Sequence, residues 1–389
     1  MASRGGGPQT IVAAVRRGKV EQAVYQAITV ACERIGRVPV RAAYDGAVSK
    51  EAVLAAQLVT ADVSEADENV DFAVSRASEA KKPVVLLSRK KGDSRPGLLT
   101  YTVSKAGIID LTAALIRRFR QALAVRAPVL CLSNQKGGVA KTTSVINLAA
   151  SLAHQEKELK SLREIARDIL VVDMDPQANL RSLLLDGEPG DLFANLRSGK
   201  PISDLVHPSQ ENKRIHVLPT QPRVETVSFS NKSVLKNALE PLRTAYDLIL
   251  IDTGGNVDDP LHVAWHAADY VLVPTDLSVH SLKTLEHYIP FVKKSQREAG
   301  FEFLGLFFTM VQAASVAASK AEIQKRLQAL IKEQGIPWIP KTISHHDVFP
   351  KALIAGKGAV EARSNSQARK DYEKLGVEIL KVIGAGFGK

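Results

Sequence analysis

The chain has 389 residues, 45% of them hydrophobic and 24% charged, a globular composition with room for two to three domains. It contains no apolar run of 18 residues and does not start like a signal peptide, so we expect a soluble cytoplasmic protein without a membrane role. Its two cysteines exclude a disulfide framework and a cysteine-held cluster. The formal net charge of +11 favours a polyanionic partner. The excess is uneven, since residues 1–125 carry 19 Lys and Arg against 12 Asp and Glu.

The first third of the chain has the pattern of a small helical domain. Residues 1–14 begin with a Gly/Ser-rich stretch that predicts disorder. Apolar spacing predicts helices at about 20–35, 49–60 and 65–80. Strands are expected at 83–88 and 98–103, joined by a basic turn, and three helices followed by a hairpin are typical of a winged helix-turn-helix. We therefore expect a DNA-binding domain at 15–105 and a linker helix at 106–126.

The basic residues of this region are the candidates for DNA contact, with a solvated turn as the alternative for the hairpin tip. The third helix is acidic near its start, which disfavours it as a recognition helix. The candidates are Arg37, Arg41, Lys50, Arg89, Lys90, Lys91 and Arg95.

From residue 127 to 389 the pattern alternates between strands and helices, which is typical of a parallel sheet covered on both faces. Strands are expected at 128–132, 169–173, 215–218, 247–252, 269–274, 303–310 and 337–343, and helices at 141–154, 232–244, 260–267, 281–298, 316–334 and 366–382. This predicts an α/β domain, with residues 155–168 as a surface insertion to which we assign no chemistry.

A glycine-containing loop, Ser133 to Thr143, separates the first of these strands from its helix. Gly137 and Gly138 allow the backbone to approach a phosphate chain, and N–H groups at a helix start bind anions. Lys141 can contact the β and γ phosphates, and the Thr142 hydroxyl can ligate Mg²⁺. The loop predicts a nucleotide site.

Acidic residues follow two of the apolar strands. Asp173 and Asp175 end the run that begins at Ile169, and Asp252 ends the run from Leu248. Carboxyl ends of parallel strands share one edge of a sheet, so these carboxylates are expected beside the phosphate loop. A structural helix cap is the alternative for one of the first two.

Four boxes in this order resemble the ParA/MinD family of ATPases, whose P-loop is a deviant Walker A box. They are Lys136-Gly-Gly-Val-Ala-Lys-Thr-Thr143, Val172-Asp-Met-Asp-Pro-Gln-Ala-Asn179, Leu248-Ile-Leu-Ile-Asp-Thr253 and Tyr270-Val-Leu-Val-Pro-Thr275. The resemblance covers about residues 128–290 and implies a P-loop NTPase fold with ATP and Mg²⁺ as cofactors.

The resemblance also implies roles for single residues. Lys136 would be the signature lysine that reaches a partner subunit's ATP, and Asp175 would orient the attacking water. The implied catalytic residues are Lys136, Lys141 and Asp175, and the implied metal ligands are Thr142, Asp173 and Asp252. The implied nucleotide-binding residues are Lys136, Gly137, Gly138, Val139, Ala140, Lys141, Thr142, Thr143 and Pro274.

Two positions depart from the family pattern. Ala140 stands where glycine is common, at a small expected cost if the position does not need positive φ. Gly254-Gly255 stands where the family usually has two prolines, so the behaviour of this switch loop cannot be carried over.

The resemblance implies a partition ATPase that forms an ATP-dependent homodimer, binds DNA non-specifically and associates with the nucleoid. The candidate contacts near the C-terminus are Lys351, Lys357, Arg363, Arg369 and Lys370. A ParB-like centromere-binding partner would stimulate hydrolysis, and the N-terminal domain would bind an operator. The alternatives are a DNA-transfer accessory ATPase of the same fold, a MinD-like membrane-cycling ATPase and an ATP-sensing transcriptional regulator.

Overall fold

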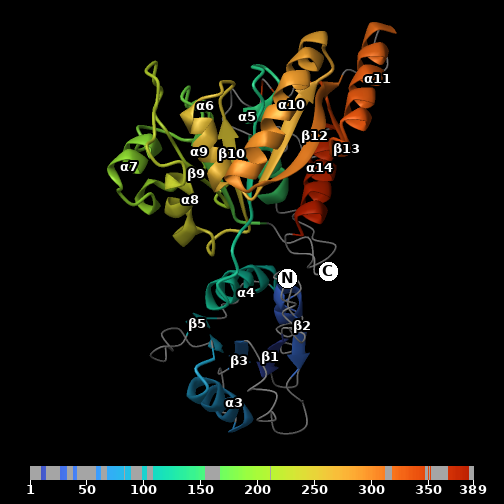
Figure 1. The fold of residues 1–389 in the computed structure, drawn as a ribbon. Helices are drawn as coiled ribbons and strands as arrows, with labels where there is room; N and C mark the ends of the chain where they lie inside the picture. The colour runs from blue at the N-terminus through green and yellow to red at the C-terminus, as the bar shows by residue number, and fades with distance from the viewer. Residues whose placement is uncertain are drawn as a thin grey trace. The chain divides into compact units, whose positions relative to one another are not determined.

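The chain folds into two compact units, which divide between Arg126 and Ala127 (Figure 1). The computed structural model describes residues 10–14, 27–32, 38–41, 58–62, 68–82, 84–88, 99–102, 108–153, 167–210, 212–311, 318–346, 349, 351 and 367–384. Unit 1 comprises the described residues up to Arg126 together with Gly384, and unit 2 comprises the described residues within 127–153 and 167–383. None of the described helices is long and apolar enough to cross a membrane.

Unit 2 is organised around an eight-stranded sheet of order β13-β12-β11-β6-β10-β7-β9-β8. All neighbouring strands are parallel except the short pair β8 and β9. The strands are β6 (Val129–Leu132), β7 (Ile169–Met174), β8 (His207–Pro208), β9 (Ile215–Leu218), β10 (Leu248–Thr253), β11 (Tyr270–Asp276), β12 (Glu302–Val311) and β13 (Trp338–Ser344). Every residue of β6, β7 and β10 is buried, as continuous apolar runs in central parallel strands predict.

Helices cover both faces of this sheet. They are α5 (Lys141–Ala153), α6 (Asn179–Leu184), α7 (Leu192–Ser198), α8 (Val234–Leu239), α9 (Asp259–Ala267), α10 (Val279–Ala299), α11 (Ala318–Glu333) and α14 (Gln367–Ile383), with 3₁₀ turns η2 (Ser203–Leu205) and η3 (Glu240–Leu242). Alternate strand residues point to opposite faces. Val129 and Cys131 therefore join Trp265 and Tyr288 in the core beneath α9 and α10 (Figure 1), whereas α5 and α14 pack together elsewhere on the sheet.

The strands and helices expected in residues 127–389 are confirmed, with ends that differ by a few residues. Sequence patterns missed the short elements α6, α7, η2 and β8, which contain too few residues to show a period. Most of the expected surface insertion, residues 155–166, lies outside the described residues.

Unit 1 has a sheet of its own, with five parallel strands in the order β2-β1-β3-β4-β5. The strands are β1 (Thr10–Ala14), β2 (Val38–Arg41), β3 (Leu58–Asp62), β4 (Val84–Ser88) and β5 (Leu99–Thr102), and the helices are α3 (Glu68–Glu79) and α4 (Ile108–Ala122). A further helical segment covers 27–32, where Ile28 and Cys32 are buried.

The winged helix-turn-helix expectation for residues 15–105 is therefore wrong. Both expected strands of the hairpin exist, as β4 and β5, but they pair in parallel. The 10 residues between them were interpreted as a turn, although that length also suits a crossover. The unalternating run at Val84–Leu87 is typical of a buried parallel strand and was the available signal.

Three neighbouring expectations change with it. Thr10–Ala14, within the stretch expected to be disordered, forms β1, and residues 58–60, within the expected second helix, belong to β3. The expected linker helix is α4, which packs on β4 and β5 and buries Leu115 and Phe119. It is thus part of unit 1.

The outer strands of the unit 2 sheet are irregular. β8 has only two residues, and β13 pairs with β12 through two register shifts and contains Pro340. On the other side of β12, the register with β11 shifts next to Gly305. Gly305 has φ +99°, and a Cβ there would lie 1.7 Å from the Pro337 carbonyl oxygen.

We predict that Gly305→Ala destabilises unit 2 by about 3–5 kcal/mol, since steric overlap adds to positive-φ strain. Gly187→Ala is the matched control, because Gly187 also has positive φ but a Cβ there would meet nothing within 4 Å. The control should lose only about 1–2 kcal/mol. Denaturant unfolding measures both, and equal losses would contradict this account of the irregularity.

Candidate functional site

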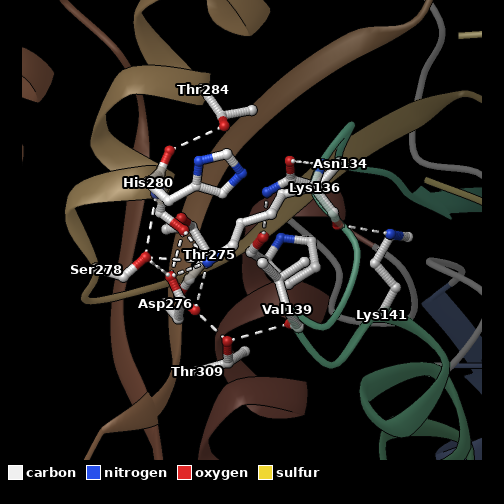
Figure 2. Close-up of polar contacts among 12 residues, drawn as sticks. Asn134, Lys136, Val139, Lys141, Thr275, Asp276, Ser278, His280, Thr284 and Thr309 are labelled. Atoms are coloured by element: carbon white, nitrogen blue, oxygen red, sulfur yellow. Dashed lines mark hydrogen bonds and ion pairs between the residues drawn. The ribbon is translucent and has the colours of Figure 1, made fainter. Parts of the chain in front are cut away.

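The loop from Ser133 to Ala140 joins β6 to α5 and is fixed by side chains from neighbouring elements (Figure 2). The Asn134 amide donates to the Pro274 carbonyl at 2.8 Å, and its oxygen accepts from the Lys136 N–H at 2.9 Å. The Thr309 hydroxyl donates to the Val139 carbonyl at 3.1 Å. Gly137 and Gly138 are exposed, so their backbone is open to a ligand.

Lys141 is the cation at the start of α5. Its side chain is buried, and its Nζ donates to the Lys136 carbonyl at 3.0 Å (Figure 2). Burial lowers the pKa of Lys141, while the charges of Asp252 and Asp175 act to raise it. These carboxylates therefore lie close enough to Lys141 to share its electrostatic environment.

The predicted carboxylates meet at the carboxyl edge of β7 and β10. Asp173 and Asp252 are paired in the parallel register, and both are fully buried. One oxygen of Asp173 accepts from the Asp175 N–H at 3.2 Å. Its other oxygen and both oxygens of Asp252 are buried without a hydrogen bond of good geometry to the described residues.

Burial determines how these acids titrate. It raises the pKa of Asp252 to about 7, with Asp175 adding to the rise and the Thr142 hydroxyl and Lys141 opposing it. Burial likewise raises the pKa of Asp173 well above its usual range, and the nearby charge of Asp252 contributes. Two buried carboxylates with unsatisfied oxygens are an incomplete arrangement that a cation would complete.

Asp175 lies just beyond the strand, and the chain holds its carboxylate from two sides. Oδ1 accepts from the Gln177 N–H at 2.9 Å, and Oδ2 accepts from the Asn179 side chain at 3.3 Å. A Cβ on Gly254 would lie 3.1 Å from Asp175 Oδ1, and a Cβ on Gly255 would lie 3.5 Å from the Gly137 nitrogen. The Gly254-Gly255 segment, which departs from the family pattern, thus runs between Asp175 and the phosphate loop.

Lys136 has its amino group in a cage of acceptors from the same chain (Figure 2). Its Nζ lies 2.7 and 2.9 Å from the Asp276 carboxylate oxygens, 3.0 Å from the Ser278 hydroxyl and 3.1 Å from the Ser281 hydroxyl. Burial acts to raise the pKa of Asp276, but hydrogen bonds from Lys136 and the serines outweigh it and leave that pKa lowered. The lysine is thus committed within its own subunit.

The residues of this cage were missed by sequence reasoning. Asp276 ends β11, and Asp252 is the second-last residue of β10, so the same rule of an acid after an apolar run would have found it. Ser278 is the N-cap of α10 and accepts from the Ser281 N–H, a role that the capping pattern predicts. Further along α10, the Tyr288 hydroxyl donates to Ser133 at 3.1 Å, which connects this helix to the phosphate loop.

Ala140 corrects one expectation. Its φ is +61°, so the position does adopt the left-handed conformation that favours glycine. The condition for a small cost, a position without positive φ, is therefore not met, and the side chain costs about 1–2 kcal/mol there.

The DNA-binding candidates have mixed outcomes. Arg37, Lys50, Arg89, Lys90, Lys91, Arg95, Lys357 and Arg363 lie outside the described residues, and Arg41 is the last residue of β2. Lys351 and Lys370 are exposed. Arg369 is buried, and its Nε donates to Glu373 at 2.5 Å, so its expected contact with DNA is wrong. Arg369 lies on the buried face of α14, to which the helical period brings every third or fourth residue.

Comparison with known proteins gives the family. A family model described as an AAA domain matches residues 127–303, starting at the first residue of unit 2. The chromosome partitioning protein ParA of Myxococcus xanthus is 32% identical over 266 residues, which cover 65% of this chain and 88% of that protein. The chain belongs to the ParA family of ATPases. The chromosome-partitioning ATPase Soj of Thermus thermophilus is 29% identical, over 64% of this chain and 94% of its own length.

Solved structures agree on the fold. The septum site-determining protein MinD of Pyrococcus horikoshii, solved in complex with Mg-ADP, has a TM-score of 0.53 at 22% identity. The match covers 67% of this chain and 98% of that one. Unit 2 of this ParA relative thus has the P-loop NTPase fold expected from sequence.

The residues present fit a nucleotide with magnesium. Mg²⁺ is commonly held by one or two carboxylates together with phosphates and water. The buried carboxylate oxygens of Asp173 and Asp252 that lack partners among the described residues can supply these carboxylate ligands. Across the described parts of the chain, no three His, Cys, Asp or Glu side chains converge to hold a metal by themselves. The site therefore suits a cation that arrives with its phosphates.

We predict that metal-free protein loses stability as pH rises from about 4 to about 7, because the folded state keeps a proton on Asp252 that the unfolded chain releases. Asp252→Asn removes the buried charge and should raise Tm at pH 8 by about 3 °C or more, but by much less at pH 5. Calorimetry in EDTA tests this, with exposed Asp186→Asn as the control. An equal shift at both pH values would contradict it.

Proposed function

We propose that this chain is a Mg²⁺-dependent ATPase of a DNA partition system, which dimerises around ATP, binds DNA non-specifically in that state and releases it after hydrolysis. The observation that carries the proposal is the intramolecular cage of Lys136 beside a complete phosphate loop. In the single chain, Lys136 is held by Asp276. In the proposed dimer, the same lysine would contact the ATP of the second subunit. This exchange gives nucleotide-controlled association a physical basis.

Binding begins at the phosphate loop. The exposed backbone at Gly137 and Gly138, together with the start of α5, offers N–H donors to a phosphate chain. The Lys141 ammonium adds a positive charge in a poorly solvated position, where its interaction with phosphate is strong. These groups bind and orient the triphosphate.

The metal would be held by the Thr142 hydroxyl and Asp252, with Asp173 in support. When bound, Mg²⁺ supplies positive charge that stabilises the phosphates during transfer. Before it binds, Asp252 must give up the proton that burial favours. Metal binding is therefore expected to release protons near neutral pH.

The position of Asp175 supports a role for its carboxylate in directing the attacking water. Its carboxylate is fixed by Gln177 and Asn179 beside the Gly254-Gly255 segment, near the buried acids. A carboxylate in this position can accept a hydrogen bond from water and hold it for attack on the γ-phosphate.

Dimerisation requires that Lys136 exchange its partners. In the single chain its charge is neutralised by Asp276 and its hydrogen bonds are satisfied. Only a more negative acceptor, the triphosphate of a second subunit, compensates for breaking these contacts. Association of two copies is thereby linked to ATP.

DNA binding is supported by positive charge on unit 2. Lys370 and Lys374 are exposed one turn apart on α14. Two copies side by side would double this charge, and affinity for phosphate backbones rises steeply with the number of contacts. A ParB-like partner that stimulates hydrolysis would then set the lifetime of the DNA-bound state. The described residues of unit 1 form a parallel sheet and no winged helix, so operator binding is not part of this proposal.

Random-sequence DNA is expected to bind the chain with ATP and Mg²⁺, and at least 10-fold more weakly with ADP or without nucleotide. Lys141→Ala should abolish both ATP hydrolysis and DNA binding, because phosphate contact is lost. Lys136→Ala should retain ATP binding but lose dimerisation and DNA binding. Fluorescence anisotropy and sedimentation velocity provide the readouts, and DNA binding that is independent of nucleotide would overturn the proposal.

Asp276→Asn tests the cage directly. Loss of the ion pair should release Lys136 and lower the ATP concentration for half-maximal dimerisation by about 5-fold or more. Glu286→Gln, an exposed change on the same helix, is the control. In a Lys136→Ala background the Asp276 change should have no effect, and a persisting effect would show that Asp276 acts through another contact.

A further inference from the structure

The strand order of unit 1 defines a position that unit 2 and its ATPase chemistry do not explain. The chain passes from β1 outward to β2, then returns across β1 to β3 and continues to β4 and β5. The direction of progress therefore reverses between β1 and β3. In open parallel sheets, ligands bind in the crevice outside the carboxyl ends of the strands at such a reversal.

The two edges of this sheet differ in chemistry. At the amino edge the strands begin with Thr10, Val38, Leu58, Val84 and Leu99, of which one is polar. At the carboxyl edge they end with Ala14, Arg41, Asp62, Ser88 and Thr102, of which four are polar or charged. The polar strand ends are thus gathered at the edge where ligands bind in open parallel sheets.

The register places these polar residues around the reversal. β1 pairs with β2 on one side and β3 on the other, and Ala13 is aligned with both Arg41 and Thr60. Arg41 and Asp62 thus flank the small end of β1, roughly 12 Å apart across two strand spacings and an offset of two residues along the strand. Ser88 follows on β4, next to the end of β3.

The residue types indicate the ligand class. An arginine suits a phosphate group, which it binds with paired hydrogen bonds. A carboxylate at the end of a strand suits sugar hydroxyls, and serine and threonine hydroxyls can bond to either. We propose that the carboxyl edge of the unit 1 sheet binds a sugar phosphate group, either free or as part of a nucleotide.

This site is separate from the nucleotide site of unit 2, and the inference does not depend on the proposed ATPase cycle. It gives the N-terminal unit a role as a ligand-binding domain. Arg41, interpreted from sequence as a DNA contact, is reassigned to this edge.

The test uses the full chain saturated with ADP and Mg²⁺, so that the P-loop site is filled. Ribose 5-phosphate, AMP and NAD⁺ are titrated separately by calorimetry, which distinguishes a free sugar phosphate from a mononucleotide and a dinucleotide. At least one should bind. Asp62→Asn and Arg41→Gln should each weaken it 10-fold or more, whereas Thr10→Ala, at the opposite edge of the same sheet, should not.

Hydrolysis of ATP should be unchanged in Asp62→Asn, which separates failure of this site from failure of the proposed function. Both substitutions keep a polar side chain, which guards against misfolding, and far-UV circular dichroism of each variant should match the parent. The inference is overturned if none of the probes binds. It is also overturned if Asp62→Asn and Arg41→Gln leave probe binding unchanged while Lys141→Ala abolishes it, because the probe would then occupy the phosphate loop of unit 2. Loss of DNA binding in Arg41→Gln without any binding of the probes would also overturn it.

Discussion

Two buried carboxylates beside one buried ammonium group are the constraint on which unit 2 depends. Asp173 and Asp252 are brought into register by the parallel pairing of β7 and β10, and the charge of Asp252 acts on Lys141 at the start of α5. Parallel strands place their carboxyl ends at one edge, so three separated stretches of sequence are forced to share a single low-dielectric space. Burying these charges without partners costs free energy, and a charged ligand that supplies the missing partners offsets that cost.

The same helix, α10, contacts both the phosphate loop and Lys136. α10 contributes Ser281 to the Lys136 cage and Tyr288 to the hydrogen bond with Ser133. The two contacts are separated by about two helical turns, so a shift of the helix would be felt at both places. In the proposed cycle, α10 would thus link nucleotide binding at the loop to the release of Lys136 within one subunit.

The long strands and helices of unit 2 and its phosphate loop could be predicted from sequence because their signals are local. Apolar runs such as Leu248–Ile251 fixed the strands, and the loop around Lys141 with its following acids fixed the site. The cage around Lys136 was missed because it depends on how β11 and α10 are placed, and the positive φ of Ala140 is a backbone property that residue identity does not disclose. In unit 1, the sequence predicted the strands β4 and β5 but not how they pair. They were expected to be antiparallel, as in a hairpin, and they are parallel.

The outer strands of the unit 2 sheet limit how copies of the chain can assemble. β8 offers only two residues for pairing, and β13 has a proline and an uneven register. A neighbouring chain would find no continuous row of peptide groups with which to extend the sheet. Assemblies that join copies through unit 2 would therefore have to be built from side-chain contacts, whose strength is easily tuned and reversed, rather than from a growing β-ladder.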